Sequence, residues 1–266
     1  MILVTGATGN VGRLVVDHLL AAGATDVRAL TNHPERAKLP PEVDVVRGYL
    51  GAVETLPAAL EGVERMYLAP LETTVREVTG LAAKAGVQHV VDLAGPKDSW
   101  WGPIEVAVEE SGVAWTHLEA GEFMDNTLSW ADQIRTTGQV RDAYPGSANA
   151  MIALDDIAAA AAVCLTQDGH TGRAYELTGP ESLTRAEKVR LIGEALGREV
   201  PYVELSHAEA VEELRPSMGE YAQWYVDGMA DLVAHPQRAL PTFRELTGRP
   251  GTTFAEWARR NVELFR

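Results

Sequence analysis

Three glycines stand near the start of the chain at a spacing of three residues: Gly6, Gly9 and Gly12. The apolar run at residues 2–4 before them is typical of a central parallel strand that is covered on both faces. After them, between residues 11 and 19, apolar side chains recur at helical spacing. This order predicts a buried strand, a glycine-rich turn and a helix.

Each glycine of such a turn has a physical use. One lets the chain turn sharply, one lets a phosphate approach the backbone, and one lets the helix pack closely on the strand. The unpaired amides of the helix start then face an anion. We therefore predict a pyrophosphate site made by Gly6, Thr8, Gly9, Asn10, Val11 and Gly12.

The rest of the first half alternates predicted strands and helices. Strands are expected at residues 26–31, 43–47, 65–69, 87–93 and 114–118, with helices between them, among them 56–60 and 73–85. Strands separated by helices require right-handed crossovers, and these give a parallel sheet. The predicted fold class is α/β, a doubly wound, Rossmann-like sheet with a smaller α/β C-terminal lobe.

Two domains are expected, a nucleotide-binding domain at residues 1–120 and a smaller substrate-binding lobe at 121–266, intertwined with the first. Short strands are predicted in this lobe at 138–144 and 150–154, followed by an alanine-rich helix that ends near residue 165. Thr184 and Glu187 have the spacing of a capping box, which predicts a helix to about Gly197. Amphipathic helices are expected at 206–233, and a final helix from residue 252.

Several stretches resemble one known family. Residues 5–13 resemble the opening of the atypical short-chain dehydrogenases/reductases of the NmrA-like branch, which includes NADPH-dependent quinone reductases and redox-sensing regulators. Residues 112–126 are similar to the sixth strand of that family and the loop after it, and residues 155–158 and 175–180 to its C-terminal half. The resemblance extends to about residue 205 and is much weaker beyond.

In a doubly wound sheet the ligand lies beyond the carboxyl ends of the strands. Asn32 and His33 follow the second strand, where an NAD site usually places an acid for the ribose hydroxyl and an NADP site places cations. No acid stands at that strand end, and Arg13 and Arg36 are near in sequence. NADP(H) is therefore expected over NAD(H), although relatives commonly have arginine where Asn32 stands.

The resemblance implies further cofactor contacts. Tyr49 stands where relatives have an acid near the adenine, and it either stacks on the adenine or packs as an ordinary aromatic. The backbone of Leu68, Ala69 and Pro70 is expected to pass the nicotinamide ribose.

The catalytic positions depart from the family pattern. Short-chain dehydrogenases usually carry a serine after the fifth strand and a Tyr-x-x-x-Lys pair that passes a proton to the substrate. Here the serine position is Ala94 or Gly95, and Lys97 and Trp101 occupy the tyrosine and lysine positions. The usual proton relay is therefore absent. Lys97 either stabilises developing negative charge or is a solvated loop lysine.

Aromatic and sulfur-containing side chains flank the expected substrate cleft. Trp100, Trp101, Phe123 and Met124 either line a pocket for a flat ring or fill the core between the lobes. Glu119 and Glu122 near the same cleft either favour a basic or hydroxylated substrate or complement a helix start.

The chain is thus expected to be an NADPH-dependent reductase that transfers hydride to a small conjugated or aromatic carbonyl compound, such as a quinone or enone. A non-catalytic NAD(P)-binding redox sensor and a redox-neutral cyclase or isomerase are the alternatives. A net charge of −15 argues against nucleic acid and anionic membranes as partners. The single cysteine, the absence of metal-ligand spacing and the absence of a long apolar run predict a cytoplasmic protein without a metal. A monomer or homodimer is expected.

Overall fold

The computed structural model describes residues 1–97, 99 and 101–266, which form two compact units. The first unit consists of Met1–Gly121, Leu154–Leu177 and Thr242–Arg249, and the second of Glu122–Ala153, Thr178–Pro241 and Pro250–Arg266. Two segments beyond the predicted boundary at residue 120 therefore belong to the first unit. They do so because one contributes a helix and a strand to its sheet layers and the other packs on that helix.

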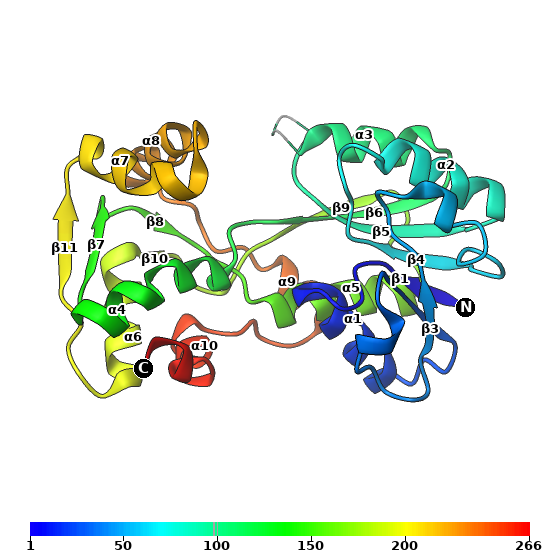
Figure 1. Cartoon of the computed structure of the whole chain (residues 1–266), viewed down its shortest axis with the longest axis horizontal. Coiled ribbons are helices and arrows are strands. Elements are labelled where there is room, and N and C mark those ends of the chain that lie inside the picture. Colours follow the sequence, from blue (N-terminus) through cyan, green and yellow to red (C-terminus); the bar gives the residue numbers. More distant parts are fainter. Residues whose placement is uncertain (98, 100) are drawn as a thin grey trace. The chain divides into compact units, whose positions relative to one another are not determined.

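Within the described part of the chain, the first unit contains one parallel sheet of seven strands in the order β3-β2-β1-β4-β5-β6-β9 (Figure 1). The strands are β1 Ile2–Val4, β2 Val27–Thr31, β3 Asp44–Arg47, β4 Arg65–Leu68, β5 His89–Ala94, β6 Ala114–Ala120 and β9 Arg173–Leu177. The first six lie close to their predicted positions. This order is that of a Rossmann-like fold, so the predicted fold class is confirmed.

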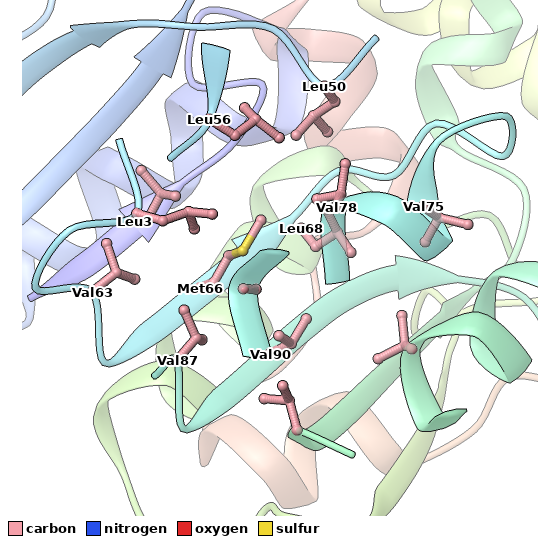
Figure 2. Packing of buried hydrophobic residues seen from close by; sticks show 14 of the residues in the cluster. Leu3, Leu50, Leu56, Val63, Met66, Leu68, Val75, Val78, Val87 and Val90 are labelled. Atoms are coloured by element: carbon pink, nitrogen blue, oxygen red, sulfur yellow. The ribbon is translucent and has the colours of Figure 1, made fainter. Parts of the chain in front are cut away.

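Helices cover both faces of this sheet. They are α1 Asn10–Ala21, α2 Val75–Ala85, α3 Gly102–Glu110, α5 Leu154–Thr166 and α9 Thr242–Thr247. Helices α2 and α3 lie over one face, and α1 and α5 pack together on the other (Figure 1). The buried residues between the sheet and α2 include Leu3, Met66, Leu68, Val78 and Val90 (Figure 2). Full burial of each such side chain contributes roughly 1.5–3 kcal/mol.

The helix predicted at residues 56–60 is wrong. The chain instead forms 3-10 helix η2 at Val53–Thr55, followed by turns. Pro57 removes one backbone donor, and Gly62 adopts a left-handed φ of +73° that ends the segment. The few residues between them are too few to nucleate an α-helix.

The second unit is a smaller α/β body. Its elements are η3 Met124–Trp130, α4 Ala131–Thr137, β7 Val140–Ala143, β8 Ala148–Asn149, β10 Leu183–Thr184, α6 Arg185–Leu196, β11 Tyr202–Leu205, α7 His207–Met218, α8 Tyr221–Ala234, α10 Phe254–Arg260 and η4 Val262–Phe265. Strand β7 pairs with β11, and β8 with β10. The predicted capping box of Thr184 and Glu187 at α6 is confirmed. The strand expected at 150–154 is reduced to a single bridge between Ile152 and Phe123.

Among residues 1–97, 99 and 101–266, none of the helices combines the length and the apolar character that crossing a bilayer requires.

Candidate functional site

The turn between β1 and α1 is packed so tightly that side chains do not fit in it. Gly6 has a left-handed φ of +59°. A Cβ atom on Gly12 would lie 2.2 Å from the carbonyl oxygen of Gly6, and one on Gly9 would lie 3.1 Å from the same oxygen. Bare backbone is therefore required at these positions, which is the steric condition for a phosphate cradle.

The start of α1 is suited to an anion. Gly9 occupies the N-cap position in extended conformation, and within the described residues it makes no side-chain cap. The first turn holds no acidic residue. Because the first amides of a helix lack intrahelical acceptors, Asn10, Val11 and Gly12 can offer theirs to a negatively charged group.

A pocket of about 430 Å³ opens at the carboxyl ends of β1, β2, β3 and β4. It is lined by Gly6, Thr8, Leu30, Thr31, Asn32, His33, Arg36, Gly48, Tyr49, Leu50, Ala69 and Leu71. The structure thus brings Gly6 and Thr8 of the predicted glycine turn, the end of β2, Tyr49 and Ala69 to one cavity. The side chain of Leu68 is instead buried in the core, so only its backbone is available to a ligand.

Hydroxyl groups hold the strand ends around this pocket. Thr5 Oγ1 donates to the carbonyl oxygen of Tyr67 at 3.0 Å and accepts from the amide of Ala69 at 2.8 Å. These two bonds join the end of β1 to the end of β4. The hydroxyls of Thr8 and Thr31 lie 3.3 Å apart and join the turn to the end of β2.

The ring of Tyr49 is 46% exposed and lies over Gly51. A Cβ atom on Gly51 would be 2.5 Å from Cε1 of the ring, so the ring can lie here only because residue 51 is glycine. The amide of Tyr49 donates to Thr55 Oγ1 at 3.0 Å and fixes the backbone. The tyrosine therefore presents an aromatic face at the pocket from a constrained loop.

The charges after β2 are arranged around one acid, Glu35. Its carboxylate accepts from Arg47 at 3.2 Å and lies 3.4 Å from His33 Nδ1. A backbone hydrogen bond and these cations hold the pKa of Glu35 below its usual range. Arg13 donates to the carbonyl oxygens of Ala37 and Lys38.

Arg36 differs from these two arginines. Its side chain lines the pocket, and its guanidinium makes neither an ion pair nor a hydrogen bond with any residue that the structure describes. From the sequence, Arg13 and Arg36 are equally good candidates for a cation at the NADP site, whereas the structure places only Arg36 at the pocket.

Polar side chains also gather on the α3 face of the sheet, at the ends of β5 and β6. We name Asp92, Glu105, Glu109, His117 and Glu119 the strand-end cluster. His117 Nδ1 lies 2.7 Å from Asp92 Oδ1, and its Nε2 lies 3.7 Å from Glu109 Oε1. Asp92, His117 and Glu105 are each at most 1% exposed.

Burial shifts the protonation of this cluster. It raises the pKa of Glu105 to about 7, and although His117 opposes this shift, the charges of Glu119 and Asp92 add to it. Burial also raises the pKa of Asp92 above its ordinary value. For His117 burial disfavours the charged form, but the hydrogen bond and charge of Asp92 outweigh it, so that its pKa is raised.

Lys97 lies at the edge of this cluster. Its ammonium group donates to Glu109 Oε2 at 2.8 Å, and this hydrogen bond raises the pKa of the exposed lysine. Its positive charge is thus already compensated by a carboxylate. Ala94 ends β5 and Gly95 follows it, so neither candidate for the serine position carries a hydroxyl, and the nearby hydroxyl is that of Ser99, 3.2 Å from where a Cβ atom on Gly95 would lie.

The predicted substrate-pocket residues belong to both units. Trp101, 38% exposed, precedes α3 in the first unit, and Trp100 lies outside the described residues. Phe123 and Met124 belong to the second unit, where Met124 is buried in the core and Phe123 is half-buried beside Ile152. Their role in binding a substrate stays a prediction.

Sequence reasoning did not assign a role to Asp92 and His117. Their only signal is that each is a titratable residue inside a predicted strand. Their contact depends on the register of β5 and β6, which places the two residues opposite each other.

A family model described as NAD(P)H-binding matches residues 6–168 of the chain. A (4-alkanoyl-5-oxo-2,5-dihydrofuran-3-yl)methyl phosphate reductase from Streptomyces griseus is 38% identical, with 100% of this chain and 99% of the relative covered. An NAD(P)H azoreductase from Xenophilus azovorans is 35% identical, with coverage of 100% and 99%.

Solved structures agree with these relatives. An NADPH-dependent quinone oxidoreductase from Escherichia coli is 27% identical and has a TM-score of 0.84, with 98% of this chain and 99% of that chain covered. The same enzyme in complex with NADPH gives a TM-score of 0.83. The family match spans more than half of the chain, and both relatives match along their whole length. The chain therefore belongs to the NAD(P)H-binding family, as an oxidoreductase of its NmrA-like branch.

Proposed function

We propose that this protein is an NADPH-dependent reductase of small conjugated acceptors such as quinones, azo compounds and activated enones. The observation that carries the proposal is the pocket of bare glycine backbone with the unpaired guanidinium of Arg36 at its rim, among the residues described. A dinucleotide needs backbone amides for its pyrophosphate, and a 2′-phosphate needs a cation.

The residues fit the cofactor as follows. The amides at Asn10, Val11 and Gly12 would hold the pyrophosphate, and Arg36 with Asn32 and His33 would hold the phosphorylated ribose. Tyr49 would stack against the adenine, and the backbone of Leu68, Ala69 and Pro70 would pass the nicotinamide ribose. When bound, the nicotinamide supplies the hydride.

The substrate class rests on what the relatives have in common. A furanone reductase, an azoreductase and a quinone oxidoreductase are each named for an acceptor with a conjugated, electron-poor double bond. Hydride addition to such a bond leaves a delocalised anion, which needs little assistance from an acid. This chemistry is compatible with a chain that lacks the Tyr-x-x-x-Lys pair. In the first unit, Trp101 is the side chain that we propose for contact with a flat acceptor.

The test is NADPH oxidation against a panel of quinones, azo dyes and furanone-type enones, with NADPH and NADH binding measured by calorimetry. We expect turnover with at least one acceptor class and tighter binding of NADPH than of NADH. Binding of NADPH without turnover across the panel would contradict the reductase.

Replacement of Arg36 by alanine tests the cofactor preference. We expect the Kd for NADPH to rise about tenfold or more, since a charge-assisted hydrogen bond contributes roughly 1.5–3 kcal/mol. The Kd for NADH should stay unchanged, because NADH has no 2′-phosphate. Arg76→Ala removes the same charge from an exposed ion pair with Glu110 and is the control. An equal loss for both nucleotides would contradict the assignment of Arg36.

A further inference from the structure

Unpartnered polar atoms are concentrated in the strand-end cluster. Among the residues that the structure describes, Asp92 Oδ2, Glu105 Oε1 and His117 Nε2 are all buried and have no hydrogen-bond partner. Buried polar groups are normally paired, so three such atoms in one cluster call for an explanation. A group whose proton is exchanged during function is one recognised reason.

The register of β5 and β6 determines on which face of the sheet, and in which order, the residues of the cluster lie. Asp92 is paired with His117, and Ala94, the last residue of β5, is paired with Glu119. Because side chains alternate along a strand, His117 and Glu119 lie on the same face. Helix α3 covers this face with Glu105 and Glu109. The acidic residues of the cluster therefore lie one after another along this face, toward the carboxyl ends of the strands, where ligands of such sheets bind.

Glu105 is surrounded by groups of both signs. These are Asp92 on β5, His117 and Glu119 on β6, Glu109 on its own helix, Lys97 in the loop before α3, and Glu176 on β9, which is paired with Glu119. The exposed pair of Arg76 and Glu110 joins α2 to α3 beyond them. Acids outnumber bases here, and their charges add to burial in raising the pKa of Glu105.

We propose that Glu119 donates the proton that completes reduction of the acceptor, and that Glu105 stores this proton. His117, held by Asp92, is a positioning residue that keeps the two carboxyl groups in place. This inference rests on the proposed reductase function. It assigns an alternative to the absent tyrosine of the short-chain dehydrogenases.

The proton balance is simple. The acceptor gains a hydride, with its two electrons, as the C–H bond of the reduced nicotinamide breaks. Glu105 passes its proton to the carboxylate of Glu119, which hands it on to the negative charge left on the acceptor and is a carboxylate again. Glu105 regains a proton from solvent. One proton from solvent is consumed for each NADPH oxidised.

The location of the stored proton is tested first, without nucleotide or substrate. An infrared pH titration of the nucleotide-free protein detects the band of a protonated carboxyl group. In the wild type we expect a band that is lost as the pH rises through about 7. It should be absent in Glu105→Gln and retained in Glu110→Gln, which changes an exposed acid on the same helix. A wild type with every carboxyl group ionised at about pH 6 would overturn the proposal.

Turnover is tested second. Because a stored proton is available only below the pKa of Glu105, we expect wild-type kcat to fall as the pH rises through about 7. Glu105→Gln should lower kcat by roughly 100-fold and remove this break, with the KM for NADPH unchanged. Glu119→Gln, at a less buried position, should lower kcat similarly and serves if Glu105→Gln does not fold. Glu110→Gln should behave as the wild type.

The outcomes separate the two proposals. Wild-type turnover with unchanged kcat and pH profile in both Gln variants would overturn the proton store and leave the reductase function intact. No turnover with any acceptor would overturn the reductase and the catalytic role of Glu119 together.

Discussion

Replacement of Gly12 by alanine is expected to abolish useful nucleotide binding. The new Cβ atom would lie 2.2 Å from the oxygen and 2.6 Å from the carbon of the Gly6 carbonyl. Both are backbone atoms of the turn, so relief requires the start of α1 to move away from β1. The amide N–H groups of Asn10 and Val11 would then no longer point toward the pyrophosphate.

The expected magnitude follows from the bonds lost. Each hydrogen bond from an amide to a charged group contributes roughly 1.5–3 kcal/mol, so loss of two weakens NADPH binding by at least about 100-fold. Overpacking should also lower the free energy of unfolding by about 1–3 kcal/mol. Calorimetric titration with NADPH and urea denaturation measure the two effects.

Gly80→Ala is the matched control for this change. Gly80 lies within α2, and among the described residues no atom comes within 4 Å of an added Cβ. The same substitution there should stabilise the helix by about 0.5–1 kcal/mol and leave NADPH affinity unchanged. If Gly12→Ala binds NADPH as tightly as Gly80→Ala, the turn is not the pyrophosphate site.

The glycine turn could be predicted from sequence because its constraints are local. A buried strand, three glycines and a helix start all fall within the first 20 residues, and each imposes its own residue type. The capping box at α6 is similarly local. The structure adds that the glycine positions exclude a Cβ, which spacing only implied.

Strand β9 could not be predicted in the same way. It is the edge strand beside β6, and its residues Arg173, Ala174 and Glu176 are exposed. An edge strand needs no continuous apolar run, so the pattern that marks the central strands is missing. The sequence therefore left residues 154–177 with the second lobe, whereas their sheet pairing places them in the first unit.

The strand-end cluster was hidden for a different reason. Asp92 and His117 are separated by 25 residues and meet only because β5 and β6 are neighbours in one particular register. By its resemblance to the short-chain dehydrogenases, the sequence puts Lys97 at the position of their tyrosine. Only the structure shows that the ammonium group of Lys97 is paired with the carboxylate of Glu109. Pairing across strands and helices decides the charge state of each group, and it is not a property of spacing.

The second large effect is expected in the second unit, at the buried pair of Arg185 and Asp142. Arg185 donates to Asp142 Oδ2, which also accepts from Trp130 Nε1 at 2.8 Å. The guanidinium lies 4.9 Å from the centroid of the Trp130 ring. Both charged side chains are only 11% exposed, so each depends on the other for compensation.

Arg185→Met should therefore lower the free energy of unfolding of this unit by roughly 3–5 kcal/mol, because it leaves a buried carboxylate without its cation. Urea denaturation followed by circular dichroism and tryptophan fluorescence measures the loss. The double variant Arg185→Met/Asp142→Asn should recover much of it, since a neutral amide keeps an acceptor for Trp130 without an unpaired charge.

Arg190→Met on the same helix is the control. Arg190 pairs with Glu194 at the surface, where both side chains are about 60% exposed, and loss of such a pair costs about 0–1 kcal/mol. The contrast between the two arginines isolates desolvation, because substitution, helix and charge change are the same. Equal small losses at both positions would mean that water reaches Asp142 and that the pair does not hold η3, β7 and α6 together.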